Sequence, residues 1–142
     1  MNGSFNKIPY SDTPPPRQEA KMELTANNNK LTGKPIATMT SSSFKISCTL
    51  TNNANIEMDI RGTTPQQYSL GSSYYSNAVI KLNGTFYYTD YSSYDAGTVT
   101  ITEVNTRNRT ISGTFSFYAS DNSYYNRATR YISNGKFENV PY

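Results

Sequence analysis

The clearest pattern along the chain is the alternation of apolar and polar residues from Phe44 to Leu50. Alternation with a period of two places successive side chains on opposite faces, so it predicts a strand with one buried face. An asparagine-rich turn at 52–55 leads to a second alternating run, 56–60, which predicts the partner strand of a hairpin. Cys48 falls on the apolar phase and is interpreted as a core residue.

Two further hairpins and a long closing strand follow. The dipeptide Asn83-Gly84 suits the positive φ angles of a type I′ turn, and the polar stretch 105–109 marks another turn. In the last strand Ile132 and Phe137 fall on opposite phases, and a bulge at Asn134-Gly135 would bring both into the core. The predicted strands are 44–50, 56–60, 78–82, 85–89, 98–102, 111–117 and 129–140.

These strands define the expected fold and core. Every connection is a hairpin or polar loop, which predicts an all-β antiparallel domain, either a β-sandwich or a meander β-barrel, of about eight to ten strands. The residues expected to be buried are Phe44, Ile46, Cys48, Leu50, Ile56, Met58, Ile60, Val99, Ile101, Phe115 and Phe117.

The region before residue 44 lacks this pattern. Pro14-Pro15-Pro16 cannot join a ladder, because proline lacks the backbone N–H. The asparagines at 27–29, together with Gly33, are expected to break any regular element around residues 21–24. The chain is therefore divided into a strand-like segment with a proline-rich linker and a β domain, which cover residues 1–18 and 19–142.

Residues 2–10 repeat the last nine residues of the chain, 134–142. Asn, Gly, Phe, Pro and Tyr are identical at five of the nine aligned positions, and Ile8 replaces Val140. The sequence predicts that 2–10 is the closing strand of a preceding copy of the domain. We expect it to dock on its own sheet; the alternatives are disorder and strand exchange between molecules.

Charge and cysteine content exclude several kinds of partner and site. Thirteen basic and ten acidic residues give a net charge of +3, too small a bias to predict nucleic acid as a partner. A single cysteine, Cys48, excludes an intramolecular disulfide and a cysteine-based zinc site. No apolar run is long enough to span a membrane and no secretion signal is present, so the chain as given is expected to be soluble.

The sequence contains no histidine. This removes Ser-His-Asp and Cys-His catalysis and the commonest metal ligands, so we expect neither an enzyme nor a metal or other cofactor. A glycoside hydrolase remains possible, since it needs only two carboxylates about 5 to 10 Å apart. Asp90, Asp95 and Asp121 are the candidates, and turn formation is the simpler interpretation of all three.

Three segments, 71–77, 87–95 and 120–126, are rich in Tyr and Ser, with Asn or Asp beside them. Tyrosine offers rigid amphipathic area and the small polar residues offer hydrogen bonds, a composition typical of binding loops. The alternative is that exposed strand ends use tyrosine because it tolerates both water and packing. The candidate binding residues are Tyr74, Tyr75, Tyr91, Tyr94, Tyr124, Tyr125, Asp90 and Asp121.

The carboxyl-terminal third carries a family resemblance. The runs 97–103 (GTVTITE), 110–117 (TISGTFSF) and 132–142 (ISNGKFENVPY) resemble a domain family of unknown function found mainly in lipoproteins of Bacteroidetes. The resemblance extends less closely back to Ile36. It implies a β-rich domain of the cell envelope or cell exterior and brings no catalytic residues, although no signal peptide or acylated cysteine stands at the front of this sequence.

Three functional hypotheses follow. The first is a non-catalytic envelope or surface domain that binds glycan or protein through the tyrosine-rich loops, or has a structural role. The second is a carboxylate-based glycoside hydrolase. The third, a small-ligand carrier, is less favoured, because the core is too poor in apolar residues to line a large cavity.

Overall fold

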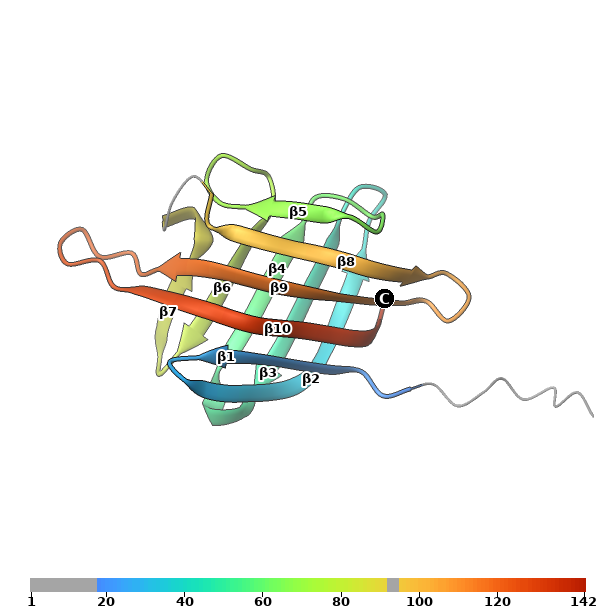
Figure 1. Cartoon of the computed structure of the whole chain (residues 1–142), viewed down its shortest axis with the longest axis horizontal. Helices are drawn as coiled ribbons and strands as arrows, with labels where there is room; N and C mark the ends of the chain where they lie inside the picture. Colours follow the sequence, from blue (N-terminus) through green and yellow to red (C-terminus); the bar gives the residue numbers. More distant parts are fainter. Residues whose placement is uncertain (1–17, 92–94) are drawn as a thin grey trace, which may run out of the picture.

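The computed structural model describes residues 18–91 and 95–142, and within these ranges the chain forms ten strands and two short 3-10 turns, η1 (Thr51–Asn53) and η2 (Thr89–Tyr91) (Figure 1). All paired strands are antiparallel. The strands are β1 (Lys21–Ala26), β2 (Asn29–Met39), β3 (Phe44–Leu50), β4 (Asn55–Ile60), β5 (Gln67–Leu70), β6 (Asn77–Leu82), β7 (Thr85–Tyr88), β8 (Gly97–Asn105), β9 (Thr110–Ser120) and β10 (Thr129–Pro141).

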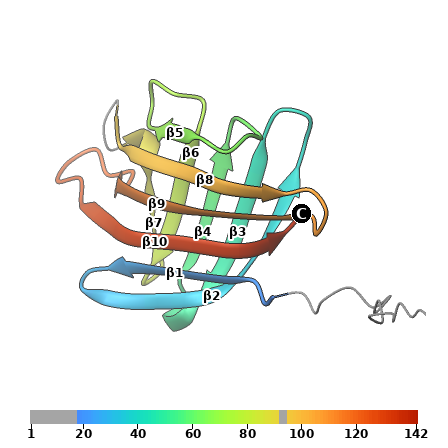
Figure 2. The same cartoon turned by 45° about the vertical axis from the view of Figure 1, so that its right-hand side comes forward.

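Eight of these strands close into a barrel in the order β1-β2-β3-β4-β6-β7-β9-β10, and β10 pairs back onto β1. β8 and β5 extend the sheet from the edge of β9 that also contacts β7. Figures 1 and 2 show β8, β9, β10 and β1 crossing steeply over β3, β4 and β6. The barrel prediction is confirmed. The sandwich alternative is wrong, because the β2–β3 pairing on one side and the β7–β9 pairing on the other join the two layers into one closed sheet.

The barrel interior is filled by the side chains that the alternation assigned to it. All eleven residues predicted to be buried are buried, and the least buried of them, Cys48, is 5% exposed. One continuous apolar cluster contains these residues and the inward side chains of β1 and β10, including Met22, Leu24, Ile132 and Phe137. The large interior side chains therefore pack against one another across the barrel.

The hairpin predictions are confirmed, with one addition in β10. Asn83 and Gly84 have φ angles of 50° and 83°, as a type I′ turn requires. The pairing of β10 shifts at the predicted bulge, where Asn134 has a φ of 52°, and both Ile132 and Phe137 are fully buried. A second shift, not predicted, occurs at Asn139, whose φ is 54°.

The prediction that residues 21–24 lack regular structure is wrong. β1 and β2 form a hairpin whose two-residue turn, Asn27-Asn28, has φ angles of 52° and 65°. Asparagine tolerates the left-handed region, so this pair makes the tight turn that Asn-Gly makes elsewhere. Gly33 does not break β2 but lets it lie close to β3, since a Cβ there would collide with the Thr49 carbonyl oxygen.

The short strand β5 was not predicted, and it pairs with β8 far along the chain. β7 meets β9 at a single residue pair, Tyr88 and Ser120. The predicted copy of the closing strand at 2–10, and the linker up to residue 17, lie outside the described residues.

Candidate functional site

The described parts of the three tyrosine-rich segments lie at one end of the barrel, on the left in Figures 1 and 2. Residues 71–76 connect β5 to β6, η2 follows β7, and residues 121–128 connect β9 to β10. Tyr94 lies outside the described residues. The sequence left open whether these segments meet, and the fold places them at the same end.

A row of three aromatic side chains runs along the outside of this end. Phe86, Tyr88 and Tyr91, which we call the aromatic track, have ring centroids 6.3 Å apart for the first pair and 5.1 Å for the second. The period of β7 explains the row: Tyr87 points into the core, so its neighbours Phe86 and Tyr88 point outward. Phe86 is 47% exposed and Tyr91 is 38% exposed, so ring surface is available to a ligand.

Arg127 fixes the 121–128 loop beside the aromatic track. Its Nη1 donates a hydrogen bond of 2.8 Å to the Tyr91 carbonyl oxygen, and its guanidinium lies 5.6 Å from the centroid of the Tyr91 ring. Tyr124 and Tyr125 project from this loop, 90% and 80% exposed, with their rings in an edge contact at 5.0 Å. The structure thus places three of the predicted residues, Tyr91, Tyr124 and Tyr125, in adjoining segments.

An open depression of about 470 Å³ lies on the outer face of β2, β3, β4, β6 and β7, and the aromatic track borders it. Strand register arranges its lining in two rows that run across the strands. Phe86 and Tyr88 end the two rows, and hydroxyl and amide side chains stand in the middle. The rows are Lys34-Thr49-Asn55-Lys81-Phe86 and Ile36-Ser47-Glu57-Val79-Tyr88.

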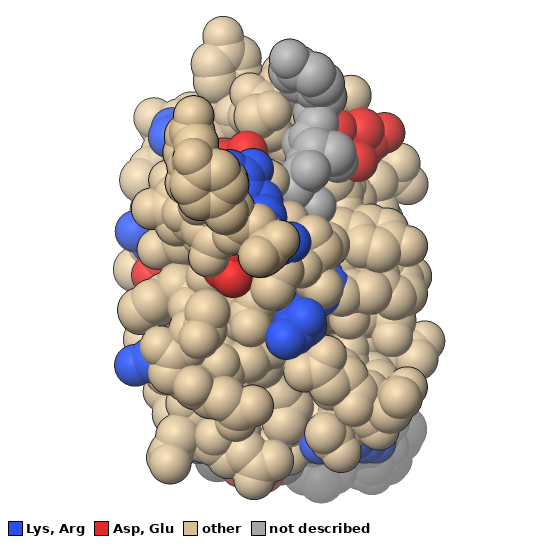
Figure 3. All heavy atoms as spheres, turned by 90° about the vertical axis from the view of Figure 1, so that its left-hand side faces the viewer, with Lys and Arg blue, Asp and Glu red and all other residues tan. Residues whose placement is uncertain are grey.

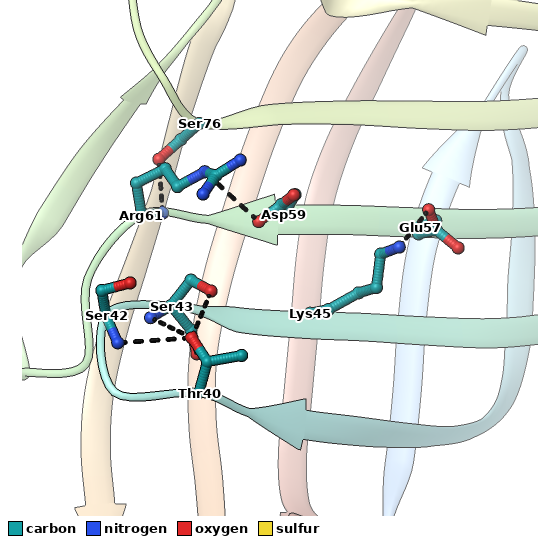
Figure 4. A network of polar contacts seen from close by, with 8 residues as sticks. All are labelled: Thr40, Ser42, Ser43, Lys45, Glu57, Asp59, Arg61 and Ser76. Carbon is teal, nitrogen blue, oxygen red and sulfur yellow. Dashed lines mark hydrogen bonds and ion pairs between the residues drawn. The ribbon is translucent and has the colours of Figure 1, made fainter.

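Two lysines, Lys34 and Lys81, and one carboxylate, Glu57, line the depression. Lys81 lies directly across the β6–β7 hairpin from Phe86, with Nζ 5.3 Å from the ring centroid. Glu57, the carboxylate of the depression, forms an ion pair of 3.4 Å with Lys45 (Figure 4). Seen from the tyrosine-rich end, exposed basic side chains lie near the middle of a largely uncharged surface (Figure 3).

Asp121 serves the loop that contains the tyrosines. Its Oδ1 accepts backbone N–H groups from Ser123 at 3.1 Å and from Ala128 at 3.2 Å, which closes the 121–128 loop. The hydrogen bond from the Ser123 backbone is the main reason that the pKa of Asp121 is lowered, with smaller contributions from Ala128 and the Arg127 charge. Asp121 therefore fits the turn-forming interpretation. Asp90 is exposed in η2 and Asp95 is exposed before β8.

Tyr74 and Tyr75 occupy the neighbouring 71–76 loop. The loop is anchored by Ser76, a buried residue whose Oγ accepts the Arg61 backbone N–H at 2.9 Å (Figure 4). Both tyrosines are exposed, and within the described ranges no hydrogen bond or ring contact joins them to the aromatic track. They share the end of the barrel with the site without forming part of the track.

The sequence prediction missed Phe86, Tyr88, Lys81 and Arg127 as site residues. Three of them could have been found. The alternation through Tyr87 places Phe86 and Tyr88 on the outer face, and the Asn83-Gly84 turn sets Lys81 opposite Phe86. Arg127 follows Tyr124 and Tyr125 closely in the sequence, but nothing local marks its contact with Tyr91, which spans 36 residues.

The remaining chemistry of the described residues is limited. Within residues 18–91 and 95–142, no group of three or more Cys, Asp or Glu side chains is placed to hold a metal ion. Burial raises the pKa of the Cys48 thiol to about 11, which keeps it in the unreactive protonated form. No helix in the same ranges is long and apolar enough to cross a membrane.

Comparison with known proteins gives one match. The family model described as "Domain of unknown function (DUF6252)" matches residues 20–141, from just before β1 to the end of β10. No curated protein and no solved structure matches the chain. The resemblance to a family of unknown function is confirmed, and the match reaches further toward the amino terminus than Ile36. The chain belongs to the DUF6252 family of domains of unknown function.

Proposed function

We propose that this chain is a non-catalytic binding domain of the cell envelope or cell surface, which takes a glycan along the aromatic track. The observation that carries the proposal is the row Phe86, Tyr88 and Tyr91 beside an open depression whose lining includes hydroxyl and amide side chains. Exposed aromatic rings cost solubility, so a row of them beside hydrogen-bonding groups favours a binding role.

The chemistry of the depression suits a sugar. A sugar ring has an apolar C–H face, which packs on an aromatic ring, and a rim of hydroxyl groups, which need donors and acceptors. Thr49, Asn55 and Ser47 supply hydroxyl and amide groups in the rows that end at Phe86 and Tyr88. Tyr124 and Tyr125 extend the available aromatic surface beyond Tyr91.

The state of Asp121 supports a non-catalytic role over a glycoside hydrolase. A general acid needs a raised pKa so that it holds its proton near neutral pH. The pKa of Asp121 is lowered, and its Oδ1 accepts hydrogen bonds from two backbone N–H groups. The chain also has no histidine to supply acid or base catalysis.

The envelope location is the second part of the proposal and is supported by the family resemblance. Fractionation of the native host, with an antibody raised against the β domain, tests it. Recovery with membranes or the cell surface supports this location, and recovery only in the cytosolic fraction contradicts it.

Affinity electrophoresis of the purified chain through gels that contain single polysaccharides tests the binding role. The panel includes neutral and acidic polymers, and titration calorimetry gives the affinity for any hit. We expect the double variant F86A/Y88A to weaken binding by about fivefold to 150-fold, since each lost stacking surface is worth about 0.5 to 1.5 kcal/mol.

The matched control is Y131A. Tyr131 is 50% exposed, a fraction similar to the 47% of Phe86. Its ring stacks on Tyr118, with centroids 4.6 Å apart, on the outer face of β9 and β10. Y131A should retain the affinity of the wild type. Equal losses in F86A/Y88A and Y131A, or no retardation by any polysaccharide, would contradict a glycan site at the track. A specific protein partner that is sensitive to F86A/Y88A would favour protein binding instead.

A further inference from the structure

We infer that the ligand of the aromatic track is an anionic glycan, whose carboxylate groups are met by Lys81 and Arg127. This inference rests on the proposed function and adds the charge of the ligand to it. Its basis is a difference among the basic side chains, which separates those that have a carboxylate partner from those that have an aromatic partner.

Most lysines of the described residues have a carboxylate within 4.0 Å. These ion pairs lie mainly on the outer faces of β1, β2, β3, β4 and β10. Glu57 of the Lys45 pair lines the depression beside the aromatic track. The basic residues in them are Lys21, Lys30, Lys34, Lys45, Arg61 and Lys136.

A second group of basic side chains has no carboxylate in ion-pair range among the described residues. Three of its members lie instead over rings of the β7–η2 segment: Lys81 over Phe86 at 5.3 Å, Arg127 over Tyr91 at 5.6 Å, and Arg130 over Tyr87 at 5.2 Å. The others are Arg107 and Arg109, of which Arg109 packs on Tyr142. Lys81 and Arg127 therefore lie beside exposed rings, those of Phe86 and Tyr91, whereas the Tyr87 ring beside Arg130 is buried.

The placement of Lys81 and Arg127 matches a ligand that runs along the track. Lys81 flanks Phe86 at one end, and Arg127 flanks Tyr91 at the other, with Tyr88 between them. A chain of sugar rings that stacks along the track would bring acidic groups near both cations. Glu57, the carboxylate beside the track, is paired with Lys45, so its repulsion of such a ligand is reduced.

Matched polymers that differ only in charge test the inference. We would measure the affinity of the full chain for polygalacturonate, alginate and hyaluronate, each against its methyl ester, which keeps the sugar backbone and removes the charge. We expect at least one acid form to bind at least about tenfold more tightly than its ester, and the affinity to fall as salt is raised from about 0.05 to 0.5 M.

Variants then locate the charge. K81Q and R127Q should each weaken binding of the acid form about three- to fivefold, the upper range for one exposed charge pair, and leave binding of the ester unchanged. The control is K30Q, which makes the same change in net charge at a lysine paired with Glu23 at 2.8 Å. R127Q also removes the hydrogen bond that fixes the 121–128 loop to Tyr91. K81Q, on strand β6 paired with β7, tests the effect of charge without this loss.

The outcomes separate the inference from the proposed function. Equal affinity for acid and ester, or binding confined to neutral polysaccharides, overturns the inference and leaves the glycan site standing. Equal losses in K81Q and K30Q overturn it as well, since they would show attraction by net charge alone. Competition by single-stranded oligothymidylate at the same affinity would show a general polyanion surface and also overturns it. Absence of binding to every polysaccharide contradicts both proposals.

Discussion

The two edges of β9 hold the barrel closed in very different ways. On one edge β9 pairs with β10 from Ser120 to Thr110, and the pairing includes two bulges that keep the core residues of β10 buried. On the other edge its pairing with β7 consists of Tyr88 and Ser120 alone. We call the β9–β10 pairing the β10 seam and the β7–β9 contact the β7 seam. The exposed aromatic track lies on β7 and η2, so the candidate site is built beside the β7 seam, which has fewer paired residues.

The partners of the basic side chains also differ between the two seams. Beside β10, Glu138 binds both Lys21 and Lys136, at 3.2 and 2.6 Å, so charges are neutralised within the protein. Beside β7, Lys81 and Arg127 lie over rings instead. One side of the barrel therefore closes the sheet through an extended pairing, and the other side carries the candidate site.

The largest expected difference is in stability. F137A removes a fully buried ring from the β10 seam and should lower the free energy of unfolding by about 3 to 5 kcal/mol, as truncation of buried aromatics does. F86A removes a half-exposed ring from the β7 seam and should cost less than about 1 kcal/mol. Urea denaturation followed by tyrosine fluorescence measures both. Losses of equal size would refute the contrast between the seams.

A smaller loss of stability is expected from a substitution just after β7, where a side chain takes the place of the backbone hydrogen bonds between β6 and β7. Thr89 is fully buried; its Oγ1 accepts the Ala78 N–H at 3.0 Å and donates to the Ala78 carbonyl oxygen at 3.3 Å. T89V leaves that N–H without a partner and should cost about 1 to 3 kcal/mol. T89S keeps the hydroxyl and is the control. If T89V unfolds at the same denaturant concentration as T89S, the hydroxyl does not stabilise the contact between η2 and β6.

Local patterns were sufficient to predict the strands that alternate strongly, and the bulge at Asn134-Gly135. That bulge could be predicted because Ile132 and Phe137 must both be buried and fall on opposite phases. The β1–β2 hairpin was missed because asparagines were treated only as breakers, although Asn27 and Asn28 adopt the positive φ angles of a tight turn.

Long-range pairing explains the other failures. β5 is four residues long and pairs with β8, so nothing in its own sequence marks it as a strand. The choice between sandwich and barrel depends on whether β7 reaches β9, which one residue pair decides. Tyrosine composition marked the end of the barrel where the candidate site lies, whereas Arg127 could be placed there only through its contact with Tyr91.

The next prediction concerns the charged surface beside β10. Hydrogen bonds from Lys136 and then Lys21 lower the pKa of Glu138 below its ordinary value of 4.5. A lowered pKa stabilises the folded protein above 4.5, and that stability is lost as the pH falls through the folded-state pKa. E138Q should therefore be slightly less stable than the wild type at neutral pH, with the difference shrinking in acid.

Urea titrations between pH 7 and pH 3 follow this difference. Because the groups are exposed, the effect should be small and should shrink further in about 1 M salt. A stability difference that is the same at every pH would assign the effect of E138Q to packing and not to the ion pairs.

The smallest expected signal is the reaction of Cys48 with a thiol reagent in the native protein. Burial raises the pKa of this thiol to about 11, and the side chain is 5% exposed, so both thiolate formation and access are suppressed. Labelling with 5,5′-dithiobis(2-nitrobenzoate) at pH 8 should therefore proceed only when the barrel opens, and unfolded protein in urea gives the unprotected rate.

Because Cys48 lies on β3, away from both seams, its labelling rate in variants of each seam reports which seam governs global opening. F137A should accelerate labelling strongly, since it raises the population of the open state, whereas F86A should label at nearly the wild-type rate. Rapid labelling of F86A would mean that the seam at β7 controls opening, and the aromatic track would then be a structural clamp as well as a surface for ligand.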